Sequence, residues 1–272
     1  MKSVGIWDKH ARQWNRLGPP LRPCAEDIGF MEQAAHCVAA GCDSPRAILL
    51  GVTPEIARMR WPAGTQLLAV DNNEEVIAKV WPGNVEIRAE AVRGDWMKLP
   101  AGDASCDVVV GDGSFITLQY PEGYAALVSE IHRVLKRGGL FAIRVFIRPD
   151  AAEPLTAVFS DLRAGRIGSF HAFKWRLAMA LHTDLEQGVR LGDIWNAWNE
   201  EVPEPDALAR MLSWPIEAIG TIDAYRELDT RYTYPTLSEF REALSAHFSE
   251  AACHHKGYEL GQRCPTFLFN PR

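Results

Sequence analysis

The sequence lacks the features that mark several large classes of protein. It has no run of about 18 apolar residues, so we expect no membrane-spanning helix, and its first residues hold no apolar signal-peptide core. Six cysteines occur among 272 residues and none forms a C-x-x-C pair, so we expect reduced thiols in a cytoplasmic protein. The formal net charge of −6 argues against a general nucleic-acid-binding surface.

A glycine-rich dinucleotide motif is also missing, although the segments that usually surround one are present. The apolar run 47–50 ends in Gly51, and a second apolar run, 67–70, ends in Asp71. The turn 52–55 between them adds no further glycine, whereas a diphosphate needs those glycines and an open helix N-terminus. An acid at the end of the second strand can accept both hydroxyls of a ribose. The pattern therefore favours an adenosine-type ligand over a dinucleotide.

The next segments continue the alternation of strands and helices. A short apolar run, 85–89, precedes Gly94, Asp95 and Trp96. An acid beside an aromatic ring suits a purine, because the carboxylate can accept from an exocyclic amine while the ring stacks. The parts that follow are a buried strand at 106–112, a helix at 124–135, a tight turn at 136–139 and a fifth strand at 140–147.

The order of these parts resembles the class I S-adenosylmethionine-dependent methyltransferases over roughly residues 45–150. The stretch 130–143, EIHRVLKRGGLFAI, carries the most specific likeness, although Arg137 stands where the family usually has proline. The turn after Gly51 also departs from the family, which usually shows several glycines there. The resemblance implies an α/β fold with a doubly wound, mostly parallel seven-stranded sheet, Rossmann-like, that binds S-adenosylmethionine at the carboxyl edge of its strands.

We expect a single domain, 1–272, in which helical additions flank a cofactor-binding core at 45–150. Helices at 4–17 and 26–40 lie in the segment 1–44. In the resembled family such helices form a lid, and packing onto the sheet is the alternative. The lid candidates are Trp7, His10, Trp14 and Arg22. After the fifth strand, we expect a helical cap at 165–235 above the sheet edge. It precedes a last antiparallel pair of strands at 252–258 and 265–269.

The candidate cofactor-binding residues lie at the ends of the expected strands. Asp71 is the strongest, because an unpaired buried acid is costly; its alternative role is a helix cap. Asp95 and Trp96 could instead be a loop acid and a core tryptophan. In the resembled family the mouth of the fourth strand faces the sulfonium, where Asp112 could orient the methionine amino group, act on substrate, or only shape a turn. The full set is Gly51, Val52, Thr53, Asp71, Asn72, Asp95, Trp96, Gly111, Asp112, Gly113 and Ser114.

The expected cap contributes further candidates without identifying a catalytic residue. His171 and Trp175 are four apart and share a helix face; His171 could act as a base, although a lone helical histidine is more often structural. Tyr232 and Tyr234 could line an acceptor pocket. The residues 253–255, with a distant Cys264, fit no common zinc spacing, so we expect no metal.

The sequence predicts an enzyme that transfers a methyl group from S-adenosylmethionine to a small-molecule acceptor, whose identity and methylated atom the sequence does not fix. One alternative is a non-catalytic protein that binds S-adenosylmethionine or S-adenosylhomocysteine. The other is an NAD-dependent dehydrogenase, against which the missing diphosphate glycines argue. We expect no nucleic-acid or membrane partner. The cap aromatics would also suit an interface between two copies of the chain, so a homodimer is an alternative use for them.

Overall fold

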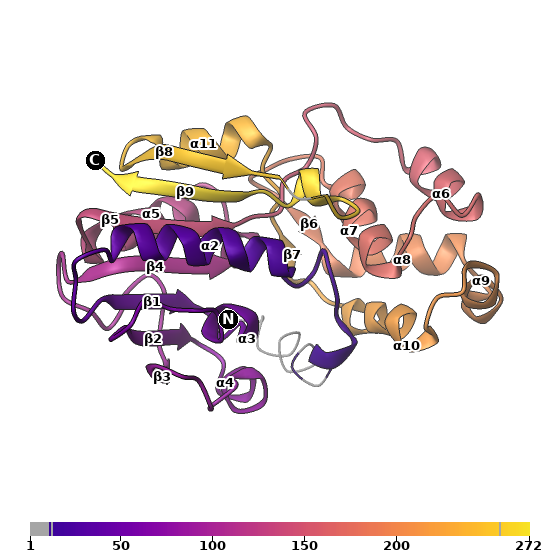
Figure 1. Cartoon of the computed structure of the whole chain (residues 1–272). Coiled ribbons are helices and arrows are strands. Elements are labelled where there is room, and N and C mark those ends of the chain that lie inside the picture. The colour runs from indigo at the N-terminus through magenta and orange to yellow at the C-terminus, as the bar shows by residue number, and fades with distance from the viewer. Residues whose placement is uncertain (1–10, 12, 256) are drawn as a thin grey trace.

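The computed structural model describes residues 11, 13–255 and 257–272, and its centre is a seven-stranded sheet. The strand order is β3-β2-β1-β4-β5-β9-β8; the first five are parallel, and β9 runs antiparallel to both β5 and β8 (Figure 1). This confirms the predicted doubly wound, mostly parallel sheet. The strands are β1 (Arg46–Leu50), β2 (Gln66–Asp71), β3 (Arg88–Arg93), β4 (Cys106–Asp112), β5 (Leu135–Arg144), β8 (Phe248–His254) and β9 (Thr266–Pro271).

Helices cover both faces of this sheet because alternate residues of its strands are apolar on each side. One face, with Leu49 and Val110, packs against α2 (Ala25–Val38), α3 (Pro54–Ala57) and α4 (Glu74–Val80). The other, with Ile48 and Phe141, packs against α5 (Glu122–Val134) and α11 (Leu237–Ser245). A capping box begins α11, with Thr236 accepting from the Glu239 N–H. The sheet is therefore buried on both sides.

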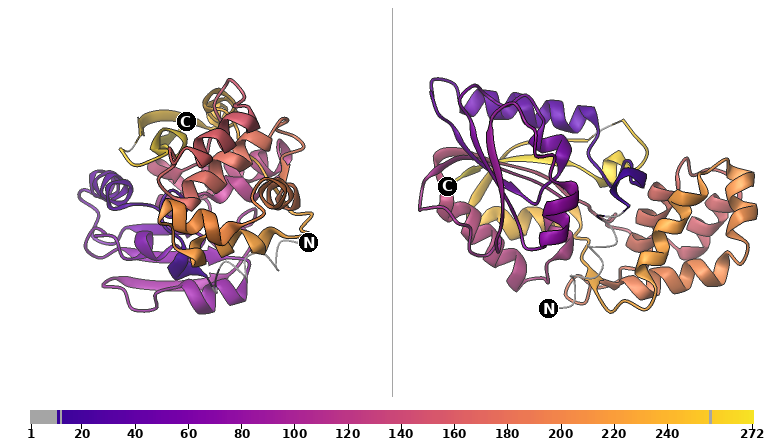
Figure 2. Two further views of the ribbon diagram at one scale, coloured as in Figure 1. Left: turned by 90° about the vertical axis from the view of Figure 1, so that its right-hand side faces the viewer. Right: turned by 90° about the horizontal axis from the view of Figure 1, so that it is seen from below.

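A separate group of helices lies beyond the carboxyl ends of the parallel strands (Figures 1 and 2). Its buried aromatic and aliphatic side chains, among them Phe173 and Trp198, form a hydrophobic cluster that extends to Ile116 and Phe146 at the sheet edge and to Leu260 and Cys264. The elements are α6 (Leu155–Arg163), α7 (Phe170–Leu181), β6 (Val189–Arg190), α8 (Leu191–Glu201), α9 (Pro205–Leu212), α10 (Ile216–Ile219), η3 (Gly220–Tyr225) and β7 (Arg231–Tyr232). Short 3-10 turns elsewhere are η1 (Trp14–Arg16), η2 (Ser114–Thr117) and η4 (Gly261–Arg263).

Some element boundaries differ from the sequence predictions. The strand expected at 252–258 is β8, which starts at Phe248 and ends at His254. The error has a physical cause: β8 is an edge strand whose residues after Phe248 are mostly exposed, so they carry little apolar signal. Similarly, the residues 136–139, which were expected to form a turn, belong to the start of β5, where the pairing with β4 is irregular. The helix expected at 4–17 falls mostly outside the described residues.

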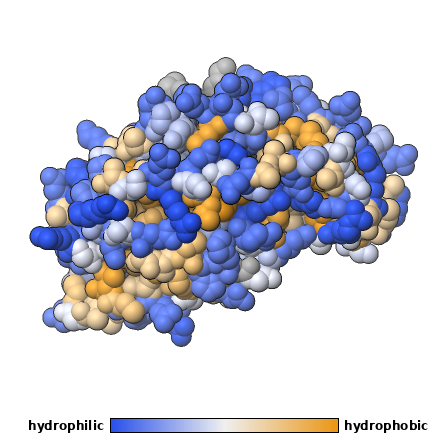
Figure 3. Space-filling model, turned by 90° about the horizontal axis from the view of Figure 1, so that it is seen from above, coloured by the Kyte–Doolittle hydropathy of each residue, from blue (hydrophilic) through white to orange (hydrophobic). Residues whose placement is uncertain are grey.

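The outer surface is mostly polar, as expected for a chain whose apolar side chains are buried in the clusters described above. The face seen from above in Figure 3 is largely hydrophilic, and its apolar residues lie in patches between polar ones. Within the described ranges, no helix combines the length and the apolar character needed to cross a bilayer.

A buried lysine inside the helical group yields a prediction about stability. Lys174 of α7 is fully buried and donates to Thr221 Oγ1 at 3.0 Å. No carboxylate among the described residues forms an ion pair with it. Burial lowers the pKa of Lys174 from 10.5 to about 7. The unfolded chain therefore binds more protons than the folded chain between about pH 7 and about pH 10.5, so this site makes stability rise with pH across that window.

We expect Lys174→Met to raise the free energy of unfolding at neutral pH, on the order of 1–4 kcal/mol, because the buried amine no longer has to lose its proton or be charged. The gain should shrink as pH rises toward about 10, since the unfolded lysine is then also neutral. Urea unfolding at several pH values measures it. An exposed-lysine control, Lys79→Met, should show no such trend, and a destabilised Lys174→Met at every pH would contradict this account of the site.

Candidate functional site

Three predicted residues converge where β1 and β2 end. Gly51 has a φ of +94° and its N–H donates to Val70 O at 2.8 Å. A Cβ added at Gly51 would lie 3.8 Å from both Asp71 Oδ2 and the Trp96 ring. Glycine is favoured by this φ, and its missing side chain leaves the backbone open beside the carboxylate and the indole. Gly51 and Asp71 therefore lie close together at the carboxyl ends of β1 and β2.

Asp71 is a largely buried carboxylate and does not cap a helix. Its Oδ1 accepts from the Asn73 N–H at 2.9 Å, while the Asn73 side chain caps α4 by accepting from the Val76 N–H at 3.0 Å. Burial raises the pKa of Asp71 to about 6, against the opposing effect of backbone hydrogen bonds from Asn73 and Asn72. A buried acid with this pKa gains from additional donors, such as ligand hydroxyls.

Trp96 is held against the same strand end. Its indole Nε1 donates to Val70 O at 2.6 Å, which fixes the ring beside Asp71 and Gly51. The neighbouring Asp95 is exposed, and its Oδ1 accepts from the Met97 N–H at 2.9 Å. The Trp96 ring is partly buried: it packs against the hydrophobic core of the sheet and also borders a cavity.

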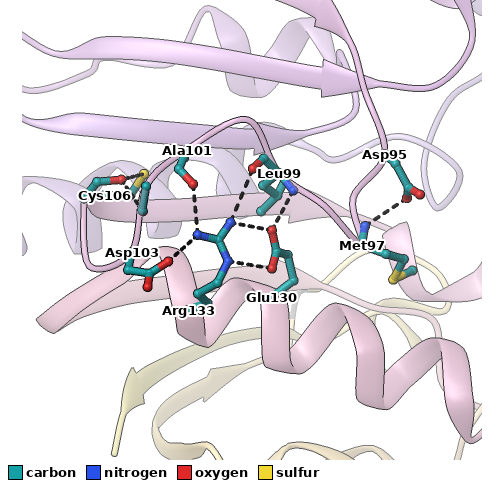
Figure 4. Close-up of polar contacts among 10 residues, drawn as sticks. Asp95, Met97, Leu99, Ala101, Asp103, Cys106, Glu130 and Arg133 are labelled. Carbon is teal, nitrogen blue, oxygen red and sulfur yellow. Dashed lines mark hydrogen bonds and ion pairs between the residues drawn. The ribbon is translucent and has the colours of Figure 1, made fainter.

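A cluster that the sequence reasoning missed holds the loop after Trp96 (Figure 4). Arg133 of α5 donates to Ala101 O at 3.0 Å, Asp103 Oδ1 at 2.6 Å and Glu130 Oε1 at 2.6 Å. Glu130 Oε1 in turn accepts from the Leu99 N–H at 2.6 Å. Glu130 and Arg133 belong to the stretch 130–143 that carried the family resemblance. The sequence therefore marked these two residues as part of a family motif, although it did not indicate their contacts. Their contacts explain how α5 fixes the loop that carries Asp95 and Trp96.

The mouth of β4 is tightly packed. A Cβ on Gly111 would meet Ile143 at 2.8 Å and Ser114 Oγ at 2.9 Å, so Gly111 makes room for its neighbours rather than facing the cavity. Gly113 has a φ of +67°, and a Cβ there would lie 2.6 Å from the Phe146 ring. Both glycines are required by packing.

Asp112 is committed to an ion pair. Its Oδ1 accepts from Arg144 Nε at 2.6 Å, and the Arg144 side chain is fully buried. Arg144 Nη1 also donates to Pro20 O at 2.8 Å and to Tyr258 Oη at 3.2 Å. The side chain of Asp112 therefore binds Arg144 instead of only shaping a turn. Asp112 also lines the cavity.

The N-terminal segment closes one side of the site. Arg22 Nε donates to Glu55 Oε1 at 2.6 Å, and Arg22 Nη1 donates to Trp14 O at 3.2 Å. At the other end, His171 Nε2 lies 2.8 Å from Arg16 O. Two of the lid candidates, Trp7 and His10, lie outside the described residues. The segment 14–22 is thus tied both to the turn after Gly51 and to α7.

A cavity joins the sheet edge, the N-terminal segment and the helical group. Of the predicted set, Gly51, Val52, Thr53, Asp71, Asn72, Asp95, Trp96, Asp112, Gly113 and Ser114 all line it, and Gly111 does not. Its remaining lining residues are Trp14, Leu17, Leu21, Leu50, Val76, Val80, Gly94, Met97, Ile116, Thr117, Leu118, Phe146, Trp175 and Tyr232. The residues expected to bind a cofactor thus border the same space as two residues of the expected cap.

The other cap candidates lie away from this cavity. His171 is buried, and burial lowers its pKa to about 4, so it stays neutral at physiological pH. Tyr234 is fully buried and packs edge-on against Trp175, with ring centroids 5.8 Å apart. No group of three or more His, Cys, Asp or Glu side chains in the described part of the chain is arranged to hold a metal ion. The geometry gives His171 a structural role.

Comparison with known proteins agrees with this geometry. A family model described as a methyltransferase domain matches residues 51–143, which run from Gly51 into β5. A search of functionally curated proteins gave no match.

Solved structures share the fold across nearly the whole chain. The CcbJ methyltransferase from Streptomyces caelestis is 13% identical, with a TM-score of 0.57 and coverage of 100% of this chain and 99% of that one. A TehB-like SAM-dependent methyltransferase from Corynebacterium glutamicum is 12% identical, with a TM-score of 0.50 and 98% of each chain covered. A Rhodobacter sphaeroides protein provisionally described as a zinc-dependent alcohol dehydrogenase is 9% identical, with a TM-score of 0.64 and coverage of 99% and 98%. At these identities the likeness concerns the fold alone.

The residues that match the domain model include the strand ends that border the cavity. The chain therefore contains a methyltransferase domain over residues 51–143.

Proposed function

We propose that the protein methylates a small-molecule acceptor bound in the cavity between the sheet edge and the helical group α6–α10. The observation that carries the proposal is the shared wall: Asp71 and Trp96 from the sheet edge line the same cavity as Trp175 and Tyr232. The edge of an open α/β sheet is where ligands bind in such folds. A concave site with a mostly apolar lining suits a small molecule better than a flat macromolecular surface.

The cofactor contacts are part of this proposal. The ionised Asp71 would accept from both ribose hydroxyls, and the fixed Trp96 ring would lie against the adenine, with Asp95 beside its amine. The backbone at Gly51, Val52 and Thr53 would approach the cofactor closely, as would Asn72. Gly113, Ser114 and the exposed side of Asp112 would border its methionine end. The unfilled space beside Gly51 supports this fit, since a Cβ there would reach toward Asp71 and Trp96.

S-adenosylmethionine, when bound, supplies an activated methyl group. The protein's own residues then have three tasks: to orient the donor, to hold the acceptor in line with it, and to exclude water. The apolar side chains of Leu17, Phe146 and Trp175 suit the last two tasks. We propose that the segments 1–44 and 165–235 act as lid and cap. The ties of Arg22 to Glu55 and of His171 to Arg16 support the lid.

The two alternatives can be weighed on structural grounds. A dinucleotide would place its diphosphate at the start of α3, where Pro54 has no N–H to offer and the Glu55 carboxylate lies nearby. That arrangement opposes an NAD-dependent dehydrogenase. A protein that only binds the cofactor would not need a second, apolar half of the cavity. The wall formed by Trp175 and Tyr232 therefore favours catalysis.

The first test is ligand choice. We expect S-adenosylmethionine and S-adenosylhomocysteine to bind with dissociation constants of about 1–100 µM, on the order of 5–8 kcal/mol, and NAD to bind far more weakly. Isothermal titration calorimetry measures all three. Tighter binding of NAD than of either adenosyl compound would be incompatible with the proposed cofactor site.

The second test concerns Asp71. Asp71→Ala should weaken S-adenosylhomocysteine binding by about 1–3 kcal/mol, because two ribose hydroxyls lose a charged acceptor. Since the hydroxyls prefer the ionised carboxylate, wild-type affinity should fall as pH drops below about 6. Asp71→Asn should remove that dependence, and the exposed-site control Asp229→Asn should retain it. Unchanged affinity in a folded Asp71→Ala protein would refute the ribose contact.

The third test separates a cap from an interface. Tyr232→Ala should lower turnover while S-adenosylhomocysteine affinity stays within about threefold, because Tyr232 lies on the acceptor side. Met211 and Ile216, the exposed large apolar residues of the described chain, sit on α9 and α10, so Met211→Ser with Ile216→Ser is the matched control for an interface. Loss of a dimer with unchanged turnover in Tyr232→Ala would assign the segment to subunit contact instead.

A further inference from the structure

A second cavity lies at the amino ends of β1, β2 and β3, at the opposite edge of the sheet from Gly51 and Asp71. Its volume is about 260 Å³, which is enough for a small polar molecule together with water. The loop 94–105 joins β3 to β4 without a helix, and Pro100 and Ala101 of this loop form one side of the second cavity.

The strand register brings two arginines to one side of the sheet in this second cavity. Arg46 is the Cα partner of Gln66, and Gln66 is the partner of Arg88. Partners in adjacent strands point to the same face, and strands lie about 4.8 Å apart, so the two arginines stand about 9–10 Å apart at Cα. The side chain between them is neutral, and Gln66 Nε2 donates to Ser44 Oγ at 2.7 Å.

Neither arginine is neutralised by a carboxylate of the described chain. The Asp107 carboxylate accepts from the backbone N–H of Arg46 at 2.9 Å, but the cation that binds it is Lys136, with Nζ at 2.7 and 2.9 Å from its two oxygens. Glu90 also lines the second cavity, yet within the described ranges it forms an ion pair with neither Arg46 nor Arg88. Two arginines and one glutamate leave the lining with an excess of positive charge.

The charge of Arg46 acts on the inner wall of the second cavity. Cys106, at the start of β4, is buried and lines this wall. Burial raises the pKa of the Cys106 thiol, and the positive charge of Arg46 is among the effects that oppose the rise. A charge that favours an anion at Cys106 also favours an anion held in the space beside it.

We propose that the second cavity binds a phosphate group between the guanidinium groups of Arg46 and Arg88. Guanidinium groups match the geometry of phosphate oxygens and form charge-assisted hydrogen bonds to them. A dianion gains more from two unpaired cations than a monoanion does, and Glu90 reduces that gain. Inorganic phosphate and a phosphate ester share this chemistry. The inference does not depend on the proposed function, because the two cavities lie at opposite ends of the same strands.

Titrations of the full chain with inorganic phosphate, phenyl phosphate and benzoate test the proposal. They are followed by two-dimensional proton–nitrogen NMR at constant ionic strength and about pH 8, where phosphate is mostly dianionic. We expect saturable shifts of the amides at 46–48, 66–68 and 88–90, with dissociation constants of about 1 mM or below for both phosphates. Benzoate, with one charge, should bind at least about threefold more weakly. Tighter binding of phenyl phosphate than of phosphate assigns an ester, and equal binding assigns the phosphate group alone.

Three substitutions separate a site from general attraction of anions. Arg46→Gln and Arg88→Gln should each weaken phosphate binding about 3–10-fold, because each removes a charged donor. Glu90→Gln should strengthen it about 1.5–5-fold, because a repelling charge is lost. Arg210→Gln, at an exposed arginine of α9, is the matched control and should change nothing. Arg46, Arg88 and Glu90 are exposed, so we expect all variants to fold, which circular dichroism checks.

The same titrations in the presence of saturating S-adenosylhomocysteine should give unchanged phosphate affinity. Loss of phosphate binding under that condition would place the anion in the cofactor cavity and overturn the inference. So would the absence of saturable shifts at these amides in the wild-type protein, or unchanged affinity in folded Arg46→Gln and Arg88→Gln proteins.

Discussion

A buried ion pair holds together the segments that shape the cavity. Arg144, at the end of β5, pairs with Asp112 at the end of β4, and the same guanidinium binds Pro20 O of the N-terminal segment and Tyr258 Oη near the C-terminus. Four stretches distant in sequence thus meet at one fully buried side chain. Removing one partner of such a pair is costly, about 3–5 kcal/mol, because the other charge is left buried and unpaired. The position of the N-terminal segment over the cavity depends on it.

The cavity is divided electrostatically. Carboxylates gather at the strand ends, and apolar rings gather on the side of α7 and β7. A positively charged donor group is favoured between them, because the acids lower the potential while aromatic faces also attract cations. Under the proposed function, cofactor and acceptor would occupy neighbouring parts of the same cavity.

The sequence was sufficient to predict the sheet and most of the residues that line the cavity at the edge of the sheet. Buried parallel strands leave continuous apolar runs, and Gly51 and Asp71 mark where two of them end, so the edge of the sheet could be located in advance. The acceptor side could be predicted only as a region, because Phe146, Trp175 and Tyr232 come from three separate elements whose approach depends on tertiary packing. Two roles were missed in the sequence analysis because they depend on contacts between separate elements. One is the brace that Glu130 and Arg133 form; the other is the pairing that removes Asp112 from simple turn chemistry.

The central claim is that the cofactor occupies the strand ends around Gly51, Asp71 and Trp96. Hydrogen–deuterium exchange with and without S-adenosylhomocysteine tests it most directly, because it reports each backbone segment without a mutation. The account predicts added protection at residues 51–55, 71–73 and 94–97, with little change in β8 and β9 at the far side of the sheet. Protection confined to other segments, with these three unchanged under saturating ligand, would contradict the account.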